Sequence, residues 1–345
     1  MGVITVRCPH CGTQREVDEA FYRREVKCPR CRQPFSVKAA LSAWARLEGQ
    51  LVEGKYRLRE MLGEGGFALV FRADEYDGGE IVGSVAVKLI YPDPEIPREV
   101  QAQELVAVLK MEHPFVVSGL SAGICELGGL SWLYLVMELA DDTLEMRMST
   151  GTLQPGDAWR FTEHVGAALA YLHKDPERFV HRDLKPANIL RFGKTWKLAD
   201  FGLVYTMERA GKTVNRPVGT ENYIPPEGYD GVVTPAWDMW SFGVMLAEAF
   251  TGQHPFKGDR HLLFAVTQLE PKLPADLPSP FNEIIRGCLI KKRAMRWTAP
   301  QVLEALNAAR GMRAYLSACR WNTSRMLQGL KQKRAPAARP QQGKS

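Results

Sequence analysis

Four of the seven cysteines lie in the first 31 residues, as two Cys-X-X-Cys pairs. The first pair is Cys8 and Cys11, the second is Cys28 and Cys31, and 16 residues separate the pairs. Two thiolates three positions apart can bind one ion from a tight turn, and a second such turn completes a tetrahedral site of four sulfurs, which suits Zn²⁺. Four protein ligands leave no position open for a substrate, so the spacing predicts a structural zinc site.

Other uses of these cysteines fit the sequence less well. A redox Cys-X-X-Cys would be a single pair beside a βαβ pattern, and an odd, clustered number of cysteines argues against a disulfide framework. His10 lies inside the first pair, but with four cysteines present we expect it to be an exposed turn residue. A Val-X-Cys-Pro-X-Cys pattern opens each half, and residues 4–37 resemble the zinc-ribbon family. We therefore expect a small β zinc ribbon over residues 1–37.

A second group of residues suits phosphate chemistry. The segment Leu62–Val70 contains Gly63, Gly65 and Gly66 between two strand-like runs, and glycines let backbone amides approach an anionic phosphate closely. Eighteen residues after Val70, an apolar strand ends in Lys88. Taken alone, these features also fit an ordinary glycine hairpin and an edge-strand charge.

The segments that follow remove this ambiguity. They read His181-Arg182-Asp183-Leu184-Lys185-Pro186-Ala187-Asn188, then Asp200-Phe201-Gly202, then Gly219-Thr220-Glu221-Asn222-Tyr223-Ile224-Pro225-Pro226-Glu227. With the glycine turn and Lys88, this ordered set resembles the eukaryotic-like protein kinase family, specifically bacterial serine/threonine kinases. The resemblance covers about residues 56–308. It implies a bilobal α+β fold and ATP- and Mg²⁺-dependent phosphorylation of protein serine and threonine, including the chain itself.

The resemblance also implies a role for each polar residue. Phosphoryl transfer depends on positioning and charge neutralisation more than on covalent participation. Asp183 is expected to accept and orient the substrate hydroxyl, and Lys185 to offset charge near the γ-phosphate. Asn188 and Asp200 would bind Mg²⁺, which prefers oxygen ligands. Lys88 would hold the α- and β-phosphates and pair with a glutamate of the next helix.

Glu99 and Glu104 are the candidates for that glutamate, and the family's usual offset before its His-Pro favours Glu104. Met137 is expected at the back of the adenine pocket, on a buried strand that leads into the hinge. The ATP-binding residues implied by the resemblance are Leu62, Gly63, Glu64, Gly65, Gly66, Phe67, Ala68, Leu69, Val70, Lys88, Glu104, Met137, Glu138 and Ala140.

The chain departs from the family pattern at two places. Ala68 replaces the third glycine of the phosphate loop, a change that related loops tolerate. The activation segment 203–218 offers three phosphate acceptors, and Arg216 occupies the position that often carries the phosphate. Among the three acceptors, Thr213 lies nearest to that position, which is expected to pair with Arg182, so we predict Thr213 as the autophosphorylation site.

Other residues are expected to support the site. A helix through Phe161 and Leu172 should precede the catalytic loop, with Asp157 as its N-cap. By resemblance, Asp238 opens a largely apolar helix and supports the catalytic loop, while Glu227 pairs with Arg296.

Charge is unevenly distributed along the 345 residues. The net charge of +6 combines eight basic and no acidic residues in 311–345 with eight basic and four acidic residues in 1–40. The middle of the chain is therefore acidic, and the overall charge does not indicate nucleic-acid binding. No uncharged apolar run approaches the ~20 residues of a spanning helix, and the N-terminus lacks a secretory pattern. We expect a cytoplasmic protein without a membrane span.

The remaining segments carry fewer signals. Residues 38–55 read as a linker, either a spacer or a short helix packed on the small lobe, and 56–310 as the kinase domain. Residues 311–345 form a basic C-terminal extension whose Lys/Arg/Pro/Gln-rich end we expect to be disordered. We expect protein substrates as partners and a regulatory protein as a candidate partner of the ribbon, with nucleic acid an unfavoured alternative.

A catalytically silent nucleotide-binding module is the alternative from another functional class. Silent relatives usually lack one or more of the four residues Lys88, Asp183, Asn188 and Asp200, and this chain has all four. The sequence therefore favours an active enzyme, although the substrate, the input signal and the oligomeric state stay open.

Overall fold

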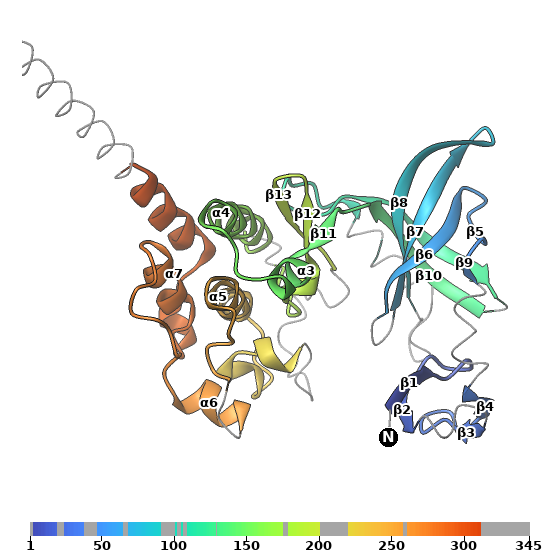
Figure 1. Ribbon diagram of the computed structural model, residues 1–345, viewed down its shortest axis with the longest axis horizontal. Helices are drawn as coiled ribbons and strands as arrows, with labels where there is room; N and C mark the ends of the chain where they lie inside the picture. Colours follow the sequence, from blue (N-terminus) through green and yellow to red (C-terminus); the bar gives the residue numbers. More distant parts are fainter. Residues whose placement is uncertain are drawn as a thin grey trace, which may run out of the picture.

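The computed structural model describes residues 3–18, 24–37, 47–64, 68–90, 101, 105, 109–128, 130–174, 179–200, 220–257 and 261–311. Figure 1 shows an antiparallel sheet on one side of the main body and a group of helices on the other, with the short strands β11, β12 and β13 between them. These two parts are called the small lobe and the large lobe below. The bilobal arrangement predicted from the sequence is therefore observed for the kinase-like part.

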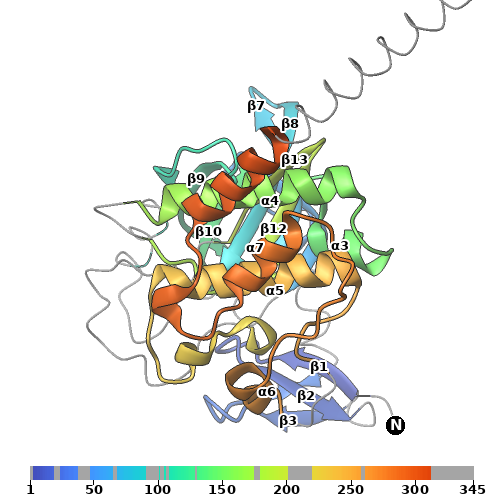
Figure 2. The same ribbon diagram turned by 90° about the vertical axis from the view of Figure 1, so that its left-hand side faces the viewer.

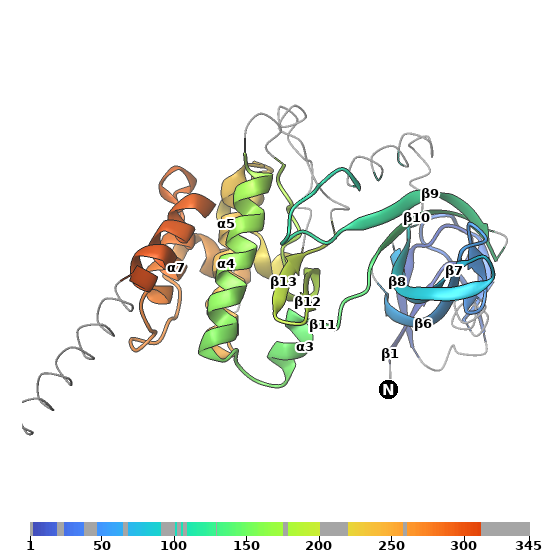
Figure 3. The same cartoon turned by 90° about the horizontal axis from the view of Figure 1, so that it is seen from above.

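The small lobe is a six-stranded sheet in the order β5-β6-β7-β8-β10-β9, with every neighbouring pair antiparallel. Its strands are β5 Leu51–Val52, β6 Tyr56–Glu64, β7 Ala68–Asp77, β8 Glu80–Ile90, β9 Gly119–Leu127 and β10 Leu130–Glu138. Figure 3, seen from above, shows β9 and β10 curving around the other strands. Because side chains alternate between the faces of a strand, each strand contributes to two environments.

One face of this sheet encloses the small-lobe core. Leu69 and Phe71 of β7 point into it with Val85 and Val87 of β8, around the fully buried Trp132. Val70, between Leu69 and Phe71, packs instead in a separate apolar cluster that lies between the lobes. Of the predicted phosphate-loop residues on β7, Leu69 is therefore buried in the small-lobe core, whereas Val70 packs in the cluster between the lobes.

The sequence assigned residues 38–55 to a linker, and the structure corrects this for 47–55. Leu47 and Val52 are buried in the small-lobe core, and β5 pairs with β6. Gln50 Oε1 accepts a hydrogen bond from the Gly128 backbone N–H at 3.2 Å. Glu53 accepts a hydrogen bond from the Tyr134 hydroxyl. Residues 38–46 lie outside the described part of the chain.

The large lobe is built on helices α4 (Pro155–Leu172) and α5 (Pro235–Thr251), which Figure 2 shows running nearly parallel in projection. The predicted apolar face of α4 is confirmed, but its N-cap is Gln154 and not Asp157. Pro155 fixes the first helical position, because its missing N–H is one that a helix start leaves unpaired. Asp157 instead lies in the first turn and pairs with Arg160 at 2.5 Å.

Shorter elements complete the main body. They are β11 Asp142–Thr143, β12 Ile189–Phe192, β13 Thr195–Leu198, α3 Leu144–Ser149, α6 Leu262–Gln268, α7 Phe281–Cys288 and the short turns η3 Pro186–Asn188, η5 Glu221–Tyr223, η6 Pro226–Gly228 and η7 Arg293–Met295. Residues 299–311 are also helical. Among the described residues, no helix is both long enough and apolar enough to cross a bilayer.

The N-terminal module, residues 3–37, consists of two small hairpins. Strand β1 (Val3–Arg7) pairs with β2 (Gln14–Asp18), and β3 (Glu25–Lys27) pairs with β4 (Pro34–Ser36). Its apolar core is small and includes Cys8 and Cys28. A chain of this size buries too little apolar surface to be stable without a further constraint.

The corrected boundary yields a prediction about truncation. A chain that starts at residue 47 should keep the stability of the main body, whereas a chain that starts at residue 56 loses Leu47 and Val52 from the core. Each such burial contributes about 1.5–3 kcal/mol, so the shorter chain should lose about 3 kcal/mol or more of unfolding free energy. Urea denaturation measures both values, and equal midpoints for the two chains would contradict the new boundary.

Candidate active site and N-terminal cysteine cluster

The loop that carries Asp183 is held by one buried carboxylate. Asp238, in the first turn of α5, is fully buried and accepts hydrogen bonds from the backbone N–H groups of His181 at 2.8 Å and Arg182 at 2.9 Å. His173 Nε2 lies 2.9 Å from the same carboxylate. These partners offset the desolvation of the charge and hold Arg182 at a φ of 67°, a conformation that non-glycine residues rarely adopt. The predicted support by Asp238 is confirmed, and His173 is a partner that the sequence analysis missed.

Asp183 is the centre of a polar cluster. Its Oδ2 accepts hydrogen bonds from Lys185 Nζ at 2.8 Å and Asn188 Nδ2 at 3.3 Å. Its Oδ1 accepts from the Thr220 backbone N–H at 3.0 Å and the Thr220 hydroxyl at 2.9 Å. One carboxylate oxygen is therefore oriented by donors of the same loop, and the other by Thr220, 37 residues further along the chain. The structure brings Asp183, Lys185 and Asn188 together as predicted, and adds Thr220.

Lys88 and Asp200 form an ion pair between the lobes. Lys88 is on β8 and is buried, and Asp200 follows β13 with a φ of 66°. Lys88, predicted to hold the α- and β-phosphates, and Asp200, predicted to bind Mg²⁺, thus contact each other directly. Glu104, the predicted partner of Lys88, lies outside the described residues.

An apolar cluster joins the lobes beside this ion pair. Ala86, Val117, Met137 and Ala199 are its buried members. Its partly buried members are Val70, Leu135, Leu139, Leu190 and Phe192. The flat, apolar character of this surface suits an aromatic base, and Met137 and Val70 lie in it as predicted. Ala86, Leu190 and Ala199 were missed because single small or aliphatic residues give no local signal in a sequence.

The predicted phosphate loop is described in part. Gly63 and Glu64 end β6, Ala68 begins β7, and Gly65, Gly66 and Phe67 lie outside the described residues. The Leu69 side chain is fully buried in the small-lobe core, so only its backbone can face a nucleotide. Leu62 is exposed by 51%.

The segment from Met137 to Ala140 leaves the sheet and connects the lobes. Both carboxylate oxygens of Glu138 accept hydrogen bonds from Lys197 Nζ at 2.7 Å, so the side chain of Glu138 is already committed. The contribution of Glu138 to a nucleotide site is therefore restricted to its backbone. Ala140 is half-buried and lies two residues before the start of β11.

Below the polar cluster, an ion pair fixes the Pro225-Pro226-Glu227 segment. Arg296 donates to both oxygens of Glu227, at 2.6 Å and 2.9 Å, and this pairing agrees with the sequence prediction. Both side chains are almost completely buried. Tyr223 donates to Glu248 at 2.7 Å. Burial and the neighbouring carboxylate raise the pKa of Tyr223, which keeps this phenol protonated. Thr213 lies outside the described residues.

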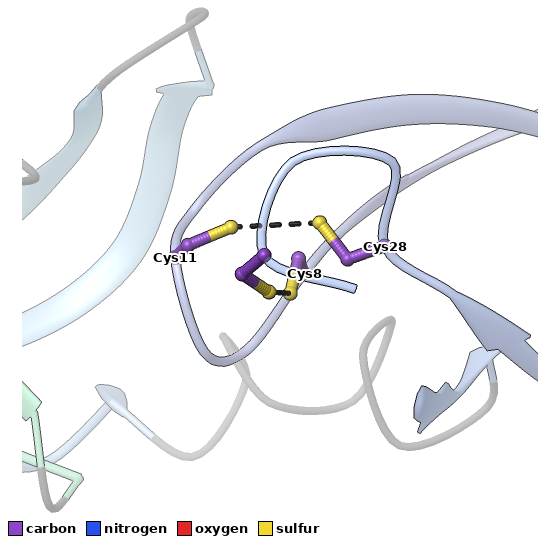
Figure 4. Close-up of side chains that lie close together, drawn as sticks. Cys8, Cys11 and Cys28 are labelled. Carbon is purple, nitrogen blue, oxygen red and sulfur yellow. Dashed lines mark hydrogen bonds between the residues drawn. The ribbon is translucent and has the colours of Figure 1, made fainter. Parts of the chain in front are cut away.

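The four N-terminal cysteines converge in one place. Their sulfur atoms all lie within 4.8 Å of one another, with 3.6 Å between Cys8 and Cys31 and 3.5 Å between Cys11 and Cys28. Figure 4 shows the Cys11 and Cys28 sulfurs pointing toward each other. These separations are far longer than the ~2.05 Å of a disulfide. Burial opposes ionisation of Cys11, but hydrogen bonds with Thr13 lower its pKa to about 6.

The two cysteine turns share one backbone design. Gly12 N–H donates to the Cys8 carbonyl at 2.9 Å, and Arg32 N–H donates to the Cys28 carbonyl at 3.0 Å. Gly12 and Arg32 have φ values of 70° and 60°, respectively. The two turns therefore have the same backbone geometry, and each contributes two of the four cysteines in the cluster.

Comparison with known proteins agrees with this geometry. The protein kinase domain model matches residues 56–306. The chain is 34% identical over 262 residues to "Serine/threonine-protein kinase PknA" of Mycobacterium tuberculosis, which covers 72% of this chain and 59% of the relative. It is 29% identical over 273 residues to "Serine/threonine-protein kinase PrkC" of Bacillus subtilis, covering 75% and 41%. It is 31% identical over 258 residues to "Mitogen-activated protein kinase kinase 7" of Arabidopsis thaliana, covering 70% and 81%.

The chain thus spans 59% of the length of the mycobacterial relative. The matched region contains both lobes, the buried Asp238 with its hydrogen bonds to the 181–182 backbone, and the polar cluster around Asp183. A family model that matches most of the chain, together with this arrangement, shows that the chain belongs to the protein kinase family.

Proposed function

We propose that this chain transfers the γ-phosphoryl group of ATP to serine and threonine hydroxyls of proteins, its own included. The observation that carries the proposal is the orientation of Asp183 by Lys185, Asn188 and Thr220. A carboxylate whose two oxygens are fixed by donors is suited to accept a proton from a hydroxyl at a defined position. The names of the PknA and PrkC relatives support serine/threonine specificity.

Each polar residue then has a physical task. Asp183 takes up the hydroxyl proton as the new P–O bond forms and the bond from the γ-phosphorus to the leaving ADP breaks, and Lys185, 2.8 Å from Asp183, offsets charge that develops on the transferred group. Asn188 donates from its amide nitrogen to the Asp183 carbonyl and carboxylate, so these hydrogen bonds do not use its amide oxygen. That oxygen and the Asp200 carboxylate form the hard oxygen donor set that suits Mg²⁺. When bound, Mg²⁺ supplies neutralisation of phosphate charge.

This assignment predicts different outcomes for two similar substitutions. Asp183→Asn should lower the rate of transfer by at least about a hundredfold, because the proton acceptor is lost, while Mg·ATP affinity stays within about threefold. Asp200→Asn should weaken Mg·ATP binding itself. Radiolabel transfer and equilibrium nucleotide binding measure both effects, and Asp230→Asn, at an exposed position, is the matched control. Substantial transfer by purified Asp183→Asn would refute the assignment of Asp183 as the proton acceptor.

We also propose Thr213 as the main autophosphorylation site. The proposal rests on the sequence, since Thr213 is the acceptor in 203–218 closest to the position expected to pair with Arg182. After incubation with Mg·ATP, peptide mass spectrometry should find phosphate at Thr213 in the unaltered chain and none in Asp183→Asn. Phosphate found at other positions alone would show that the prediction is wrong.

For the N-terminal module we propose a zinc ribbon that serves regulation or partner binding. Four cysteine sulfurs within 4.8 Å of one another match the donor set that Zn²⁺ prefers, and their separations of 3.5 Å and 3.6 Å leave room for a central ion. Structural zinc contributes ~10–16 kcal/mol in small domains, more than the core of this module can supply. Metal binding and folding of residues 1–37 are then one event.

Purified protein should therefore contain one Zn²⁺ per chain. The double substitution Cys28→Ser and Cys31→Ser should remove the metal and expose residues 1–37 to proteases, while activity on a generic peptide stays within about twofold. Cys125→Ser is the control, because Cys125 lies on β9 away from the cluster. If elemental analysis finds no zinc in protein that was purified in the absence of chelators, the proposed metal site is wrong. Loss of kinase folding in the double variant would refute the independence of the module.

A further inference from the structure

One ion pair connects the strand end at the hinge with β13, the strand that leads to Asp200. Glu138 is the last residue of β10, and Lys197 is on β13, three residues before Asp200. Lys197 Nζ lies 2.7 Å from each oxygen of the Glu138 carboxylate. Glu138 belongs to the small-lobe sheet and Lys197 to the separate sheet of β11, β12 and β13, whose Trp196 and Leu198 pack in the core of the large lobe, so this pair connects the two lobes.

Both partners are held in place by further contacts. Glu138 Oε1 also accepts the Ser118 backbone N–H at 2.7 Å, and the Glu138 N–H donates to the Ser118 carbonyl at 3.2 Å. Lys197 Nζ lies over the Phe192 ring, 4.7 Å from its centroid. The Lys197 and Glu138 side chains are exposed by 17% and 25%. A pair this well buried and this well positioned is stronger than an ordinary surface salt bridge.

The surrounding backbone makes the connection stiff. The Val117 N–H donates to the Leu198 carbonyl at 2.9 Å, and the Leu198 N–H donates to the Phe115 carbonyl at 2.9 Å. The segment that leads to Ser118 is thereby bonded to the same strand, β13, that carries Lys197. Movement of the hinge relative to β13 would have to break the ion pair or these backbone bonds.

We infer that Lys197 is a positioning residue for Mg·ATP. Its ion pair with Glu138 sets the separation between the hinge, where the adenine is expected, and Asp200, where the metal-bound phosphates are expected. The inference rests on the proposed assignment of these two ends of the nucleotide site. Lys197 acts through Glu138 and β13, so its effect should be larger for a ligand that reaches both ends of the site than for one that reaches the hinge alone.

Two ligands distinguish this role from a general effect on the fold. Adenosine reaches the hinge alone, whereas Mg²⁺ with a non-hydrolysable ATP analogue needs the hinge and Asp200 together. Lys197→Met should raise the dissociation constant of the Mg²⁺–analogue complex about tenfold, equivalent to about 1.4 kcal/mol, and change that of adenosine less than about twofold. Calorimetric titration of the full chain measures both, and bound adenosine also verifies that the variant is folded.

Companion variants isolate the ion pair. Glu138→Gln keeps an oxygen for the Ser118 N–H but loses the charge, so it should match Lys197→Met, and combining the two should add little further loss. Lys197→Arg should restore analogue binding, because guanidinium can also bind both carboxylate oxygens. Lys194→Met, at an exposed position in the turn before β13, is the matched control and should bind both ligands normally.

Unchanged analogue affinity in Lys197→Met, or an equal loss for adenosine and the analogue, would overturn the inference and leave the proposed function intact. Additive losses in the double variant would also overturn it, because independent effects would then account for both residues. Failure of the unaltered chain to bind Mg²⁺ with the analogue would overturn the proposed function and this inference together.

Discussion

The active arrangement depends on a single carboxylate that is shielded from water. Asp238 is fully buried, and a buried charge is tolerated only where donors replace its hydration. The donors are backbone groups of the loop that carries Asp183, so satisfying the charge and shaping the loop are the same event. His181 also connects this loop to the segment that carries Asp200, since its Nε2 lies 2.9 Å from the carbonyl oxygen of Ala199. The loop that carries Asp183 and the residue before Asp200 are thereby both connected to the buried carboxylate of Asp238.

Much of this constellation could be predicted from the sequence, for a chemical reason. Proton acceptance, phosphate neutralisation and metal binding each require particular side-chain types. The motif that contains Asp183, Lys185 and Asn188 can therefore be recognised in the sequence by its resemblance to the protein kinase family. The buried pair Glu227–Arg296 could be predicted as well, because its two residues belong to the family motifs. The identity of such residues is constrained by function or by charge pairing, and the local context alone reveals them.

Features that depend on packing were less accessible. Leu69 is adjacent to Val70, but strand alternation sends it into the core, and only the three-dimensional register decides which of the two faces the site. The helix start at Gln154 was misjudged because Pro155 sets it by backbone geometry, against the usual preference for Asp as a cap. Residues 47–55 carry no motif, and they join the small lobe through Leu47, Val52 and side-chain hydrogen bonds to a hairpin about 80 residues further along the chain.

The long reach of the buried ion pairs has a consequence for the chain as it leaves the ribosome. The loop at 181–183 is shaped by Asp238, and the segment ending at Glu227 is anchored by Arg296, so each contact joins an early segment to a much later one. A nascent chain that has exposed Asp183, Lys185 and Asn188 but not yet residue 296 contains the reactive groups without the scaffold that aligns them. The arrangement around Asp183 is therefore completed only after residue 296 has been synthesised, and translation products that end before it lack the Glu227–Arg296 anchor.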